Sequence, residues 1–482
     1  MDTNLKALQP AAVWHYFSEI AGIPRPSHHE ERIRQYIVDF AKAHKLEHCV
    51  DSANNVYVRK PATPGMENRK GIVLQAHLDM VPQKNNDKVF DFENDPIEAY
   101  VDGKWVTANG TTLGADNGIG VATILAVLAD NDIPHGELEG LFTATEETGM
   151  DGAFGLKAGL LKGDILLNLD SESEGELYVG CAGGLDLNAS FSYTAKPAPA
   201  GYTAVKLTVK GLKGGHSGIQ IGCQRGNANR LLFRFLNATK QEWLLASVDG
   251  GGLRNAIPRE AVATLLVKDA AAFAAEVAEY EKTVIAEFAG IEDAISIIVA
   301  PAAAPATVIP AQTADRLAKA VIGVADGVAK MSTAMEGLVQ TSTNLARVVS
   351  DGNSVKLQCL LRSSMNSEKV ALAEAMTAVL ELAGAKVELS GAYDGWNPDM
   401  ESPILHAMTA SYKALFGKEP AVTAIHAGLE CGIIGGTYPH LDMISFGPTI
   451  CYPHSPDEKV EIASVGKFYE FLLDTLKNAP AK

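Results

Sequence analysis

Two adjacent glutamates, Glu146 and Glu147, follow an apolar stretch in the sequence LFTATEETGMDGA, residues 141–153. Neighbouring carboxylates after a buried strand can divide two tasks of hydrolytic chemistry between them. One can ligate a metal ion, while the other takes a proton from the water that the metal activates. A Glu-Glu pair is more often a solvated turn, so the interpretation depends on partners elsewhere in the chain.

Four further candidate ligands fall at or just beyond the ends of predicted strands and loops. They are His77, Asp116, Asp170 and His454. Each alone has an ordinary alternative: a strand-end histidine, a helix cap, a turn-forming aspartate and a solvent-facing loop histidine. Open α/β sheets bind their ligands at strand ends, which favours treating the residues as a set.

Asp79 lies two residues after His77 in the predicted strand GIVLQAHLDMV. Residues i and i+2 of a strand point to the same face about 7 Å apart, so Asp79 can orient the His77 ring. A ligating histidine commonly donates its second N–H to such a carboxylate. The alternative is a histidine at a strand end with an unrelated surface aspartate.

Two imidazoles and three carboxylates without a thiolate are typical of a catalytic zinc, manganese or cobalt site. Five ligands exceed what one tetrahedral zinc ion with an open position needs. They suit two ions about 3.5–4 Å apart that share a carboxylate and a water. Glu146 can then move a proton from this water to a leaving amine.

The order and spacing of these motifs resemble the co-catalytic zinc aminoacylase/carboxypeptidase family, and within it the bacterial aminoacyl-histidine dipeptidase (peptidase D, carnosinase-like) branch. The likeness covers essentially the whole chain, including IPRPSHHEERI near the start and KGGHSG further on. The motifs that carry it are His77-Leu-Asp79, Gly114-Ala-Asp116-Asn117-Gly118, Glu146-Glu147-Thr-Gly149, Leu169-Asp170 and Pro453-His454-Ser455.

The resemblance implies a role for each member of the set, with two divalent ions per chain, zinc or else cobalt or manganese. Asp116 would bridge the ions, Glu146 would be the general base and acid, and Asp79 would orient a ligand. The remaining ligands form two pairs, one for each ion: His77 with Asp170, and Glu147 with His454.

The resemblance also implies substrate-binding residues outside the metal set. His216, in the glycine-rich turn of KGGHSG, would stabilise the oxyanion, although a surface histidine is the plainer interpretation. Asn255 in RNAIPRE would contact the substrate backbone, and Arg362 in LQCLLRSS its terminal carboxylate, where a surface ion pair is the alternative. Glu430 in HAGLECGIIGG would meet the free amino group of a dipeptide, where an ordinary glycine-rich loop with one glutamate is the alternative.

The elements that must position these residues follow two different patterns of predicted secondary structure. From Gly71 to Ala182, short apolar strands alternate with helices, which predicts an α/β fold with a mixed, largely parallel and buried sheet flanked by helices. Longer alternating strands and an Ala-rich helix follow. The pattern of short apolar strands and helices then returns. We therefore expect a discontinuous di-zinc exopeptidase-like catalytic domain, residues 1–182 and 400–482, with an inserted α+β lid, residues 183–399. A weak repeat within the lid relates segments around Asn255 and Asn344.

Composition excludes several classes of function. The net charge of -17 disfavours nucleic acid and anionic membrane surfaces as partners. The start lacks an export signal and no run reaches the ~18 apolar residues of a membrane span, so we expect a cytoplasmic protein. Six scattered cysteines without a C-x-x-C pair predict buried thiols.

The expected activity is hydrolysis of dipeptides with a free N-terminus, with Xaa-His and β-alanyl-histidine as the substrates that the resemblance implies. A homodimer is also expected from the family. An N-acyl amino acid deacylase or carboxypeptidase would use the same metal chemistry, and a non-catalytic metal-binding or peptide-binding protein could use the same scaffold. A two-metal phosphoesterase is disfavoured, because no basic phosphate pocket is evident.

Overall fold

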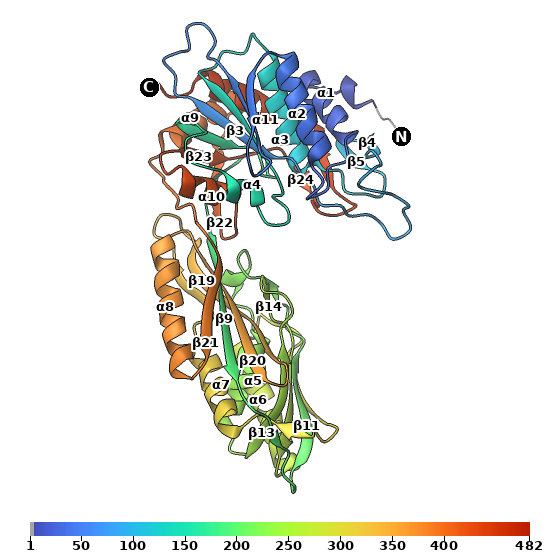
Figure 1. Ribbon diagram of the computed structural model, residues 1–482, viewed down its shortest axis with the longest axis vertical. Coiled ribbons are helices and arrows are strands. Elements are labelled where there is room, and N and C mark those ends of the chain that lie inside the picture. Colours follow the sequence, from blue (N-terminus) through green and yellow to red (C-terminus); the bar gives the residue numbers. More distant parts are fainter. Residues whose placement is uncertain (1–3) are drawn as a thin grey trace. The chain divides into compact units, whose positions relative to one another are not determined.

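The computed structural model describes residues 4–482, and the chain folds into two compact units. The first unit contains Met1–Gly180, Pro398–Ala424 and Leu429–Lys482. The second contains Cys181–Asn397 and the short segment Ile425–Gly428. In Figure 1 the first unit accordingly carries the blue and red ends of the colour ramp, and the second carries mainly the green-to-orange middle.

An eight-stranded mixed sheet forms the centre of the first unit. β6, β3, β7 and β23 are parallel to one another, whereas β1, β2 and β8 join by antiparallel pairing. The strands in spatial order are β1 (Glu47–Val50), β2 (Val56–Lys60), β6 (Leu138–Thr143), β3 (Ile72–His77), β7 (Ile165–Asn168), β23 (Asp442–Ser445), β8 (Glu176–Cys181) and β22 (Ala421–Ile425). The predicted α/β class, with parallel strands at the centre of the sheet, is confirmed.

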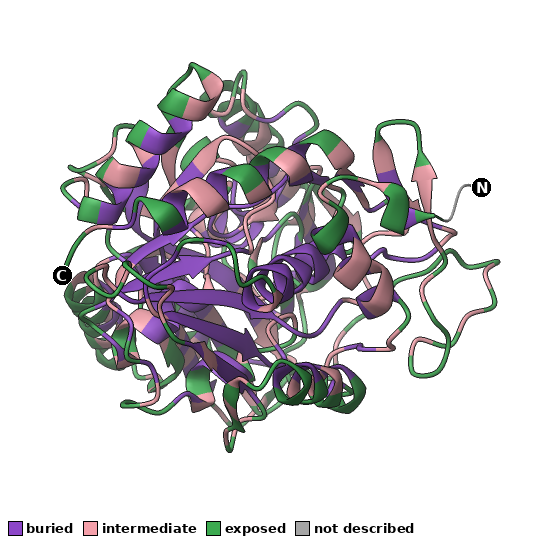
Figure 2. Ribbon diagram, turned by 90° about the horizontal axis from the view of Figure 1, so that it is seen from above, coloured by how far each residue is buried: buried purple, intermediate pink, exposed green. Residues whose placement is uncertain are grey.

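The central strands are buried on both faces, and most of their side chains are apolar. Every residue of β3, β6 and β7 is buried, as the purple strands of Figure 2 show. α3 (Ala115–Ala129) is apolar on all sides and is buried from Ala115 to Leu128, where it packs against β3. The other helices of the unit are α1 (Ala11–Ala21), α2 (Glu31–Ala43), α4 (Asp151–Gly155), α9 (Pro403–Phe416), α10 (Glu430–Thr437) and α11 (Ile462–Lys477).

A smaller antiparallel sheet in the first unit supports the loop that contains His454. Its strands are β24 (Ile450–Cys451), β25 (Lys459–Glu461), β5 (Trp105–Ala108) and β4 (Ala99–Asp102). The loop between β24 and β25 is therefore held at both ends by pairing of these two strands. The backbone of the loop that contains His454 is therefore anchored at both ends.

The second unit is built on a nine-stranded sheet that consists of two similar halves. The first half is β11 (Thr203–Lys210), α5 (Ala228–Ala238), β13 (Trp243–Gly250), β15 (Ala261–Val267), α6 (Ala270–Glu287) and β16 (Ser296–Pro301). The second half is β9 (Gly183–Ser192), α7 (Ala311–Gly323), β19 (Val339–Ser350), β20 (Ser354–Ser363), α8 (Asn366–Leu382) and β21 (Lys386–Tyr393). Each half therefore follows the order strand, helix, strand, strand, helix, strand.

The two halves meet at equivalent strands. The spatial order β16-β11-β15-β13 in one half continues as β19-β20-β9-β21 in the other, which is the reverse order of equivalent strands. β13 and β19 pair antiparallel through Asp249 with Val349 and Gly250 with Val348. One hydrophobic core runs beneath both halves. Short additional strands are β10 (Lys196–Pro197), β12 (Gly215–His216), β14 (Ala256–Ile257), β17 (Thr307–Val308) and β18 (Gly327–Met331).

Asn344 sits inside β19, where its Nδ2 donates to the carbonyls of Arg254 and Ala256 at 3.1 and 2.9 Å. None of the six cysteines, all within residues 4–482, forms a disulfide, but the expectation that they are buried is wrong for Cys49 and Cys223, which are exposed. Among residues 4–482, none of the helices combines the length and apolar character that crossing a bilayer requires.

Candidate metal centre

The five predicted ligands all belong to the first unit and come from neighbouring strand ends and loops. Because β3, β6 and β7 run parallel, the segments that follow them emerge at the same edge of the sheet. His77 ends β3, Glu147 lies in the loop after β6, and Asp170 follows β7. Asp116 lies at the start of α3, and His454 lies in the loop after β24.

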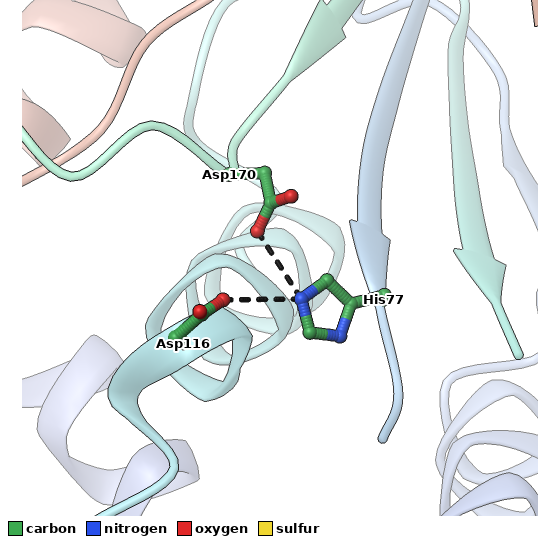
Figure 3. Close-up of side chains that lie close together, drawn as sticks. All are labelled: His77, Asp116 and Asp170. Carbon is green, nitrogen blue, oxygen red and sulfur yellow. Dashed lines mark hydrogen bonds and ion pairs between the residues drawn. The ribbon is translucent and has the colours of Figure 1, made fainter. Parts of the chain in front are cut away.

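The two imidazoles approach opposite oxygens of one carboxylate. His77 Nε2 lies 3.1 Å from Asp116 Oδ1 and 3.3 Å from Asp170 Oδ1, as Figure 3 shows. His454 Nε2 lies 3.2 Å from Asp116 Oδ2 and 3.0 Å from Glu147 Oε2. Asp116 therefore stands between two groups, each of which contains one histidine and one further carboxylate.

These groups have the spacing of metal ligands. The ligand atoms of His77, Asp116 and Asp170 all lie within 4.8 Å of one another, and so do those of Asp116, Glu147 and His454. The structure thus brings together all five residues that the sequence indicated, as two triads that share Asp116. A third group within the same limit is His77, Glu146 and Glu147.

The electrostatics of the cluster favour cations. Burial, with Asp116 and Glu147 among the neighbouring charges, raises the pKa of Asp170 to about 6. Burial also raises the pKa of Glu146 well above its usual value, and the charges of Asp170 and Glu430 add to this effect. Burying several carboxylates together is costly unless cations or hydrogen bonds compensate them. Oxygen and nitrogen donors in this number fit divalent ions such as zinc, and the buried Oε1 of Glu147 has no hydrogen-bond partner.

Asp79 connects His77 with the Glu146–Glu147 turn. Its Oδ1 lies 3.3 Å from His77 Nδ1, and its two oxygens accept the main-chain N–H groups of Glu146 and Glu147 at 2.9 and 3.1 Å. Burial opposes ionisation of Asp79, but hydrogen bonds from His77, Ser27 and Glu146 hold its pKa at about 2. One ionised carboxylate therefore fixes both a candidate ligand and the backbone of the candidate base.

Glu430 lies beside the cluster, at the start of α10, and is 1% exposed. Its Oε2 accepts hydrogen bonds from Gln75 Nε2 at 2.6 Å and Thr143 Oγ1 at 2.9 Å, while the buried Oε1 has no partner. Burial, with the charge of Asp170, raises its pKa to about 7 despite the nearby His77. A buried carboxylate with an oxygen left without a partner can receive a charged ligand group.

Sequence reasoning missed Glu458, which holds the turn that leads to Asp116. Its Oε2 accepts the N–H groups of Leu113 and Gly114 at 2.8 and 3.0 Å. Its Oε1 accepts those of Ala115 and Asp116 at 2.7 and 3.3 Å. Glu458 lies four residues after His454, but the pattern PHSPDEKVE alone gives no reason to separate it from a surface acid.

The predicted substrate residues of the second unit lie around one short strand. His216 is in β12, which pairs with β14, and the Asn255 carbonyl accepts the N–H of Ser217 at 2.8 Å. Ser217 Oγ lies 3.4 Å from Arg362 Nε, and Arg362 Nη1 lies 3.2 Å from the hydroxyl of Tyr393. Arg362 is only 5% exposed, so it is not the surface ion pair that the alternative interpretation required.

The hydrogen bonds of His216 define its neutral form. Its Nδ1 accepts the N–H groups of Gly218 and Ile219, each at 3.1 Å. Burial and the nearby Arg362 lower its pKa, which favours the neutral ring. A neutral ring that accepts at Nδ1 carries its proton on Nε2 and can donate from there. His426, which the sequence did not single out, lies near it, with Nε2 2.7 Å from Ser342 Oγ.

Comparison with known proteins assigns the family. A model of peptidase family M20/M25/M40 matches residues 73–478. The chain belongs to this family. The cytosol non-specific dipeptidase of Escherichia coli K12 is 48% identical over 487 residues, which cover 100% of both chains. The resemblance to bacterial dipeptidases of the aminoacylase/carboxypeptidase family and the expectation of a dipeptide-hydrolysing enzyme are thereby confirmed.

Solved structures support the same fold for this M20/M25/M40 peptidase. The aminoacylhistidine dipeptidase of Vibrio alginolyticus matches with a TM-score of 0.94 and 48% identity over 99% of each chain. The aminopeptidase PepT of Bacillus cereus matches with a TM-score of 0.58 over 98% of this chain and 99% of its own. At 14% identity, the second match speaks for the fold alone.

Proposed function

We propose that this M20/M25/M40 peptidase is a metal-dependent dipeptidase that acts on substrates with a free N-terminus, Xaa-His dipeptides among them. The observation that carries the proposal is the pair of ligand triads that share Asp116, with the half-buried Glu146 beside them. The full-length relatives named as a non-specific dipeptidase and an aminoacylhistidine dipeptidase support the substrate class.

Two divalent ions, zinc in our proposal, would be held by the two triads. When bound, they would polarise the scissile carbonyl and lower the pKa of the attacking water. His77 and Asp170 would hold one ion, Glu147 and His454 the other, and Asp116 both. Cobalt and manganese have the same preference for nitrogen and oxygen ligands and remain the alternatives.

Glu146 moves the proton in the proposed reaction. Its raised pKa suits a group that must both accept and donate a proton near neutral pH. It accepts the proton of the attacking water as the nucleophile adds to the peptide carbonyl. It then donates that proton to the departing amine nitrogen as the C–N bond breaks. The main-chain hydrogen bond from Glu146 to Asp79 keeps the residue in register with His77 during both transfers.

Recognition of the two substrate termini is assigned to separate residues. Oε1 of Glu430, which is buried without a partner, would accept the free ammonium group. Arg362 would bind the terminal carboxylate, for which its planar guanidinium is well shaped, and Asn255 would contact the substrate backbone. His216 would donate from Nε2 to the developing oxyanion. In this proposal the first unit, to which Glu430 belongs, is the catalytic domain, and the second unit, to which His216, Asn255 and Arg362 belong, is the lid.

A substrate panel tests the function. The protein is stripped with a chelator, reloaded with zinc, cobalt or manganese, and assayed for amine release from β-alanyl-histidine, Ala-His, Ala-Ala and their N-acetyl derivatives. We expect hydrolysis of the free dipeptides, with rates about 10- to 100-fold lower for acetylated ones, because Glu430 loses a charged partner worth about 1.5–3 kcal/mol. Equal rates on acetylated substrates would instead identify a deacylase.

A pair of variants belongs to the same experiment. Glu146→Gln is expected to retain metal and to lose activity by about 10²- to 10⁴-fold, because it removes proton transfer alone. The matched control is Glu137→Gln, which alters a carboxylate that pairs with Arg59 in the same unit. Absence of hydrolysis in every reloaded form would favour a metal-binding or peptide-binding protein. Cleavage of phosphate esters would favour a two-metal phosphoesterase.

The cytoplasm and a homodimer remain parts of the proposal. The relative in Escherichia coli is named as a cytosolic enzyme, which supports the first. The dimer is expected from the family resemblance, and light scattering of the metal-loaded protein measures it directly.

A further inference from the structure

Arg25 is a buried cation that the proposed reaction does not use. It belongs to the sequence IPRPSHHEERI, before the start of the family match at residue 73. The residue is 2% exposed, so its charge must be compensated within the protein. A fully buried guanidinium needs hydrogen-bond acceptors around it, and for Arg25 these lie within the first unit.

The guanidinium of Arg25 binds main-chain carbonyls from two loops that carry candidate ligands. Its Nη1 donates to the carbonyls of Leu78 and Asp79 at 2.9 and 2.7 Å, directly after His77. Its Nη2 donates to the carbonyl of Gly114, two residues before Asp116. One planar group thus bridges the end of β3 and the turn that begins α3.

Two glycines of the sequence GADNG leave room for this group. A Cβ atom built on Gly114 or on Gly118 would lie 2.7 Å from Arg25 Nη2. Gly118 lies inside α3 without a positive φ, so its backbone does not require glycine. The close approach of Arg25, together with Phe17 at 3.1 Å, gives a reason for glycine there.

The residues after Arg25 contact the loop after β3 again and also the loop after β6, which contains Glu146 and Glu147. Ser27 Oγ donates to Asp79 Oδ2 at 2.8 Å. Glu30 Oε1 accepts from the N–H and the hydroxyl of Thr145 at 3.1 and 2.9 Å, immediately before Glu146. The segment 25–30 therefore braces all three loops, and Arg25 makes the connection between His77 and Asp116.

We propose that Arg25 is a positioning residue that sets the separation of the His77 and Asp116 loops and thereby the geometry of the paired-metal site. The inference rests on the proposed function, because it needs the five ligands to hold ions. The inference is supported by the planar, forked shape of the guanidinium. Its three N–H···O=C bonds point in fixed directions and reach two loops at once. A lysine ammonium on a flexible side chain does not reproduce this geometry.

The test compares Arg25→Lys, which keeps the charge and loses the fork, with Arg25→Met, which loses both. The control is Arg69→Lys, since Arg69 also donates to a main-chain carbonyl of the first unit, that of Ala479 at 2.8 Å. Chelator-stripped proteins are titrated with Co²⁺ by calorimetry, and the visible absorption of bound Co²⁺ reports coordination geometry. Circular dichroism and thermal melting report the fold.

We expect the unsubstituted protein and Arg69→Lys to bind two Co²⁺ ions with the same spectrum. Arg25→Lys should lose about 10- to 100-fold in affinity for at least one ion, which is typical for residues that orient ligands, and its Co²⁺ spectrum should change. It should resemble Arg25→Met. An Arg25→Lys protein with unchanged affinities and spectrum would overturn the inference. Failure of the unsubstituted protein to bind two ions would refute the metal site itself, which is a separate result.

A second variant covers the case in which Arg25→Lys does not fold. Gly118→Ala leaves Arg25 in place but pushes against its Nη2, and alanine is otherwise favourable in a helix. Its control is Gly466→Ala in α11, where a Cβ atom would meet nothing within 4 Å. We expect Gly118→Ala to weaken Co²⁺ binding and Gly466→Ala to leave it unchanged. Equal binding by both would overturn the role of Arg25.

Discussion

His454 shows how the hydrogen bonds of a single residue govern metal binding. Hydrogen bonds to Asp116 and Glu147 raise the pKa of His454 to about 11 in the metal-free protein. The ring is therefore protonated at neutral pH, whereas a ligating imidazole must be neutral. An ion that enters this triad must displace the proton.

Metal binding should accordingly release protons and become tighter as pH rises. At any pH below about 11, His454 releases its proton to the solvent when an ion binds, and the Asp170 carboxyl, with a pKa of about 6, releases a further proton below pH 6. Affinity should therefore fall most steeply with acidification below pH 6. Zinc titrations in buffers of different ionisation enthalpy measure the proton count. Binding without proton release at pH 7 would contradict the assignment of His454.

The clustering of the candidate ligands could be predicted from the sequence because each follows an apolar strand or precedes an apolar helix. His77, Glu147 and Asp170 stand at ends of β3, β6 and β7, and parallel neighbours bring such ends together. Arg25 could not be predicted in the same way. Its partners are main-chain carbonyls, which have no side-chain signature, and they lie 53 to 89 residues away in the chain.

At the level of elements, the turn before α3 is held from two sides. Glu458 accepts four successive N–H groups from Leu113 to Asp116, while Arg25 donates to the carbonyl of Gly114. The backbone before Asp116 is thus held both through its N–H groups, by Glu458, and through the Gly114 carbonyl, by Arg25. A ligand that must serve two ions gains from such a rigid base.

Glu458→Gln tests this arrangement. A glutamine amide presents one acceptor oxygen, so its NH₂ group would face N–H donors and leave some of them unsatisfied, at a cost of about 1–3 kcal/mol. We expect a lower melting temperature and weaker zinc binding. Glu461→Gln is the control, since Glu461 pairs with the exposed Lys104 at 2.8 Å. Identical melting and zinc affinity in the two variants would argue against the role of Glu458.

The types of the elements were easier to predict than their pairing. The alternating strands and helices expected from Gly71 to Ala182 include β3, β6, β7, β8 and α3, because apolar runs and periodicity are local signals. The stretch AFGLKAGLL, residues 153–161, is helical only as far as Gly155, where α4 ends. The pairing of β13 with β19 joins residues about a hundred positions apart, and a local pattern does not specify it.

At the scale of the molecule, all five candidate ligands lie in the first unit. A ligand that binds only the folded form stabilises that form, by about 2.7 kcal/mol at one hundred times its dissociation constant. Zinc should therefore raise the melting temperature of the first unit and leave that of the second nearly unchanged. Calorimetry with and without chelator, with limited proteolysis to assign each transition, measures this. Equal shifts of both melting transitions would contradict the prediction that zinc stabilises the first unit alone.

The paired strands β10 and β17 have a consequence for how the second unit arose. Lys196 lies opposite Val308, so the chain enters the inner half, β11 to β16, beside the point where it leaves. A segment whose two ends touch can be gained or lost at a single place in a gene without rerouting the flanking chain. The matching strand order of the two halves is the arrangement that insertion of a copied module at this place would produce.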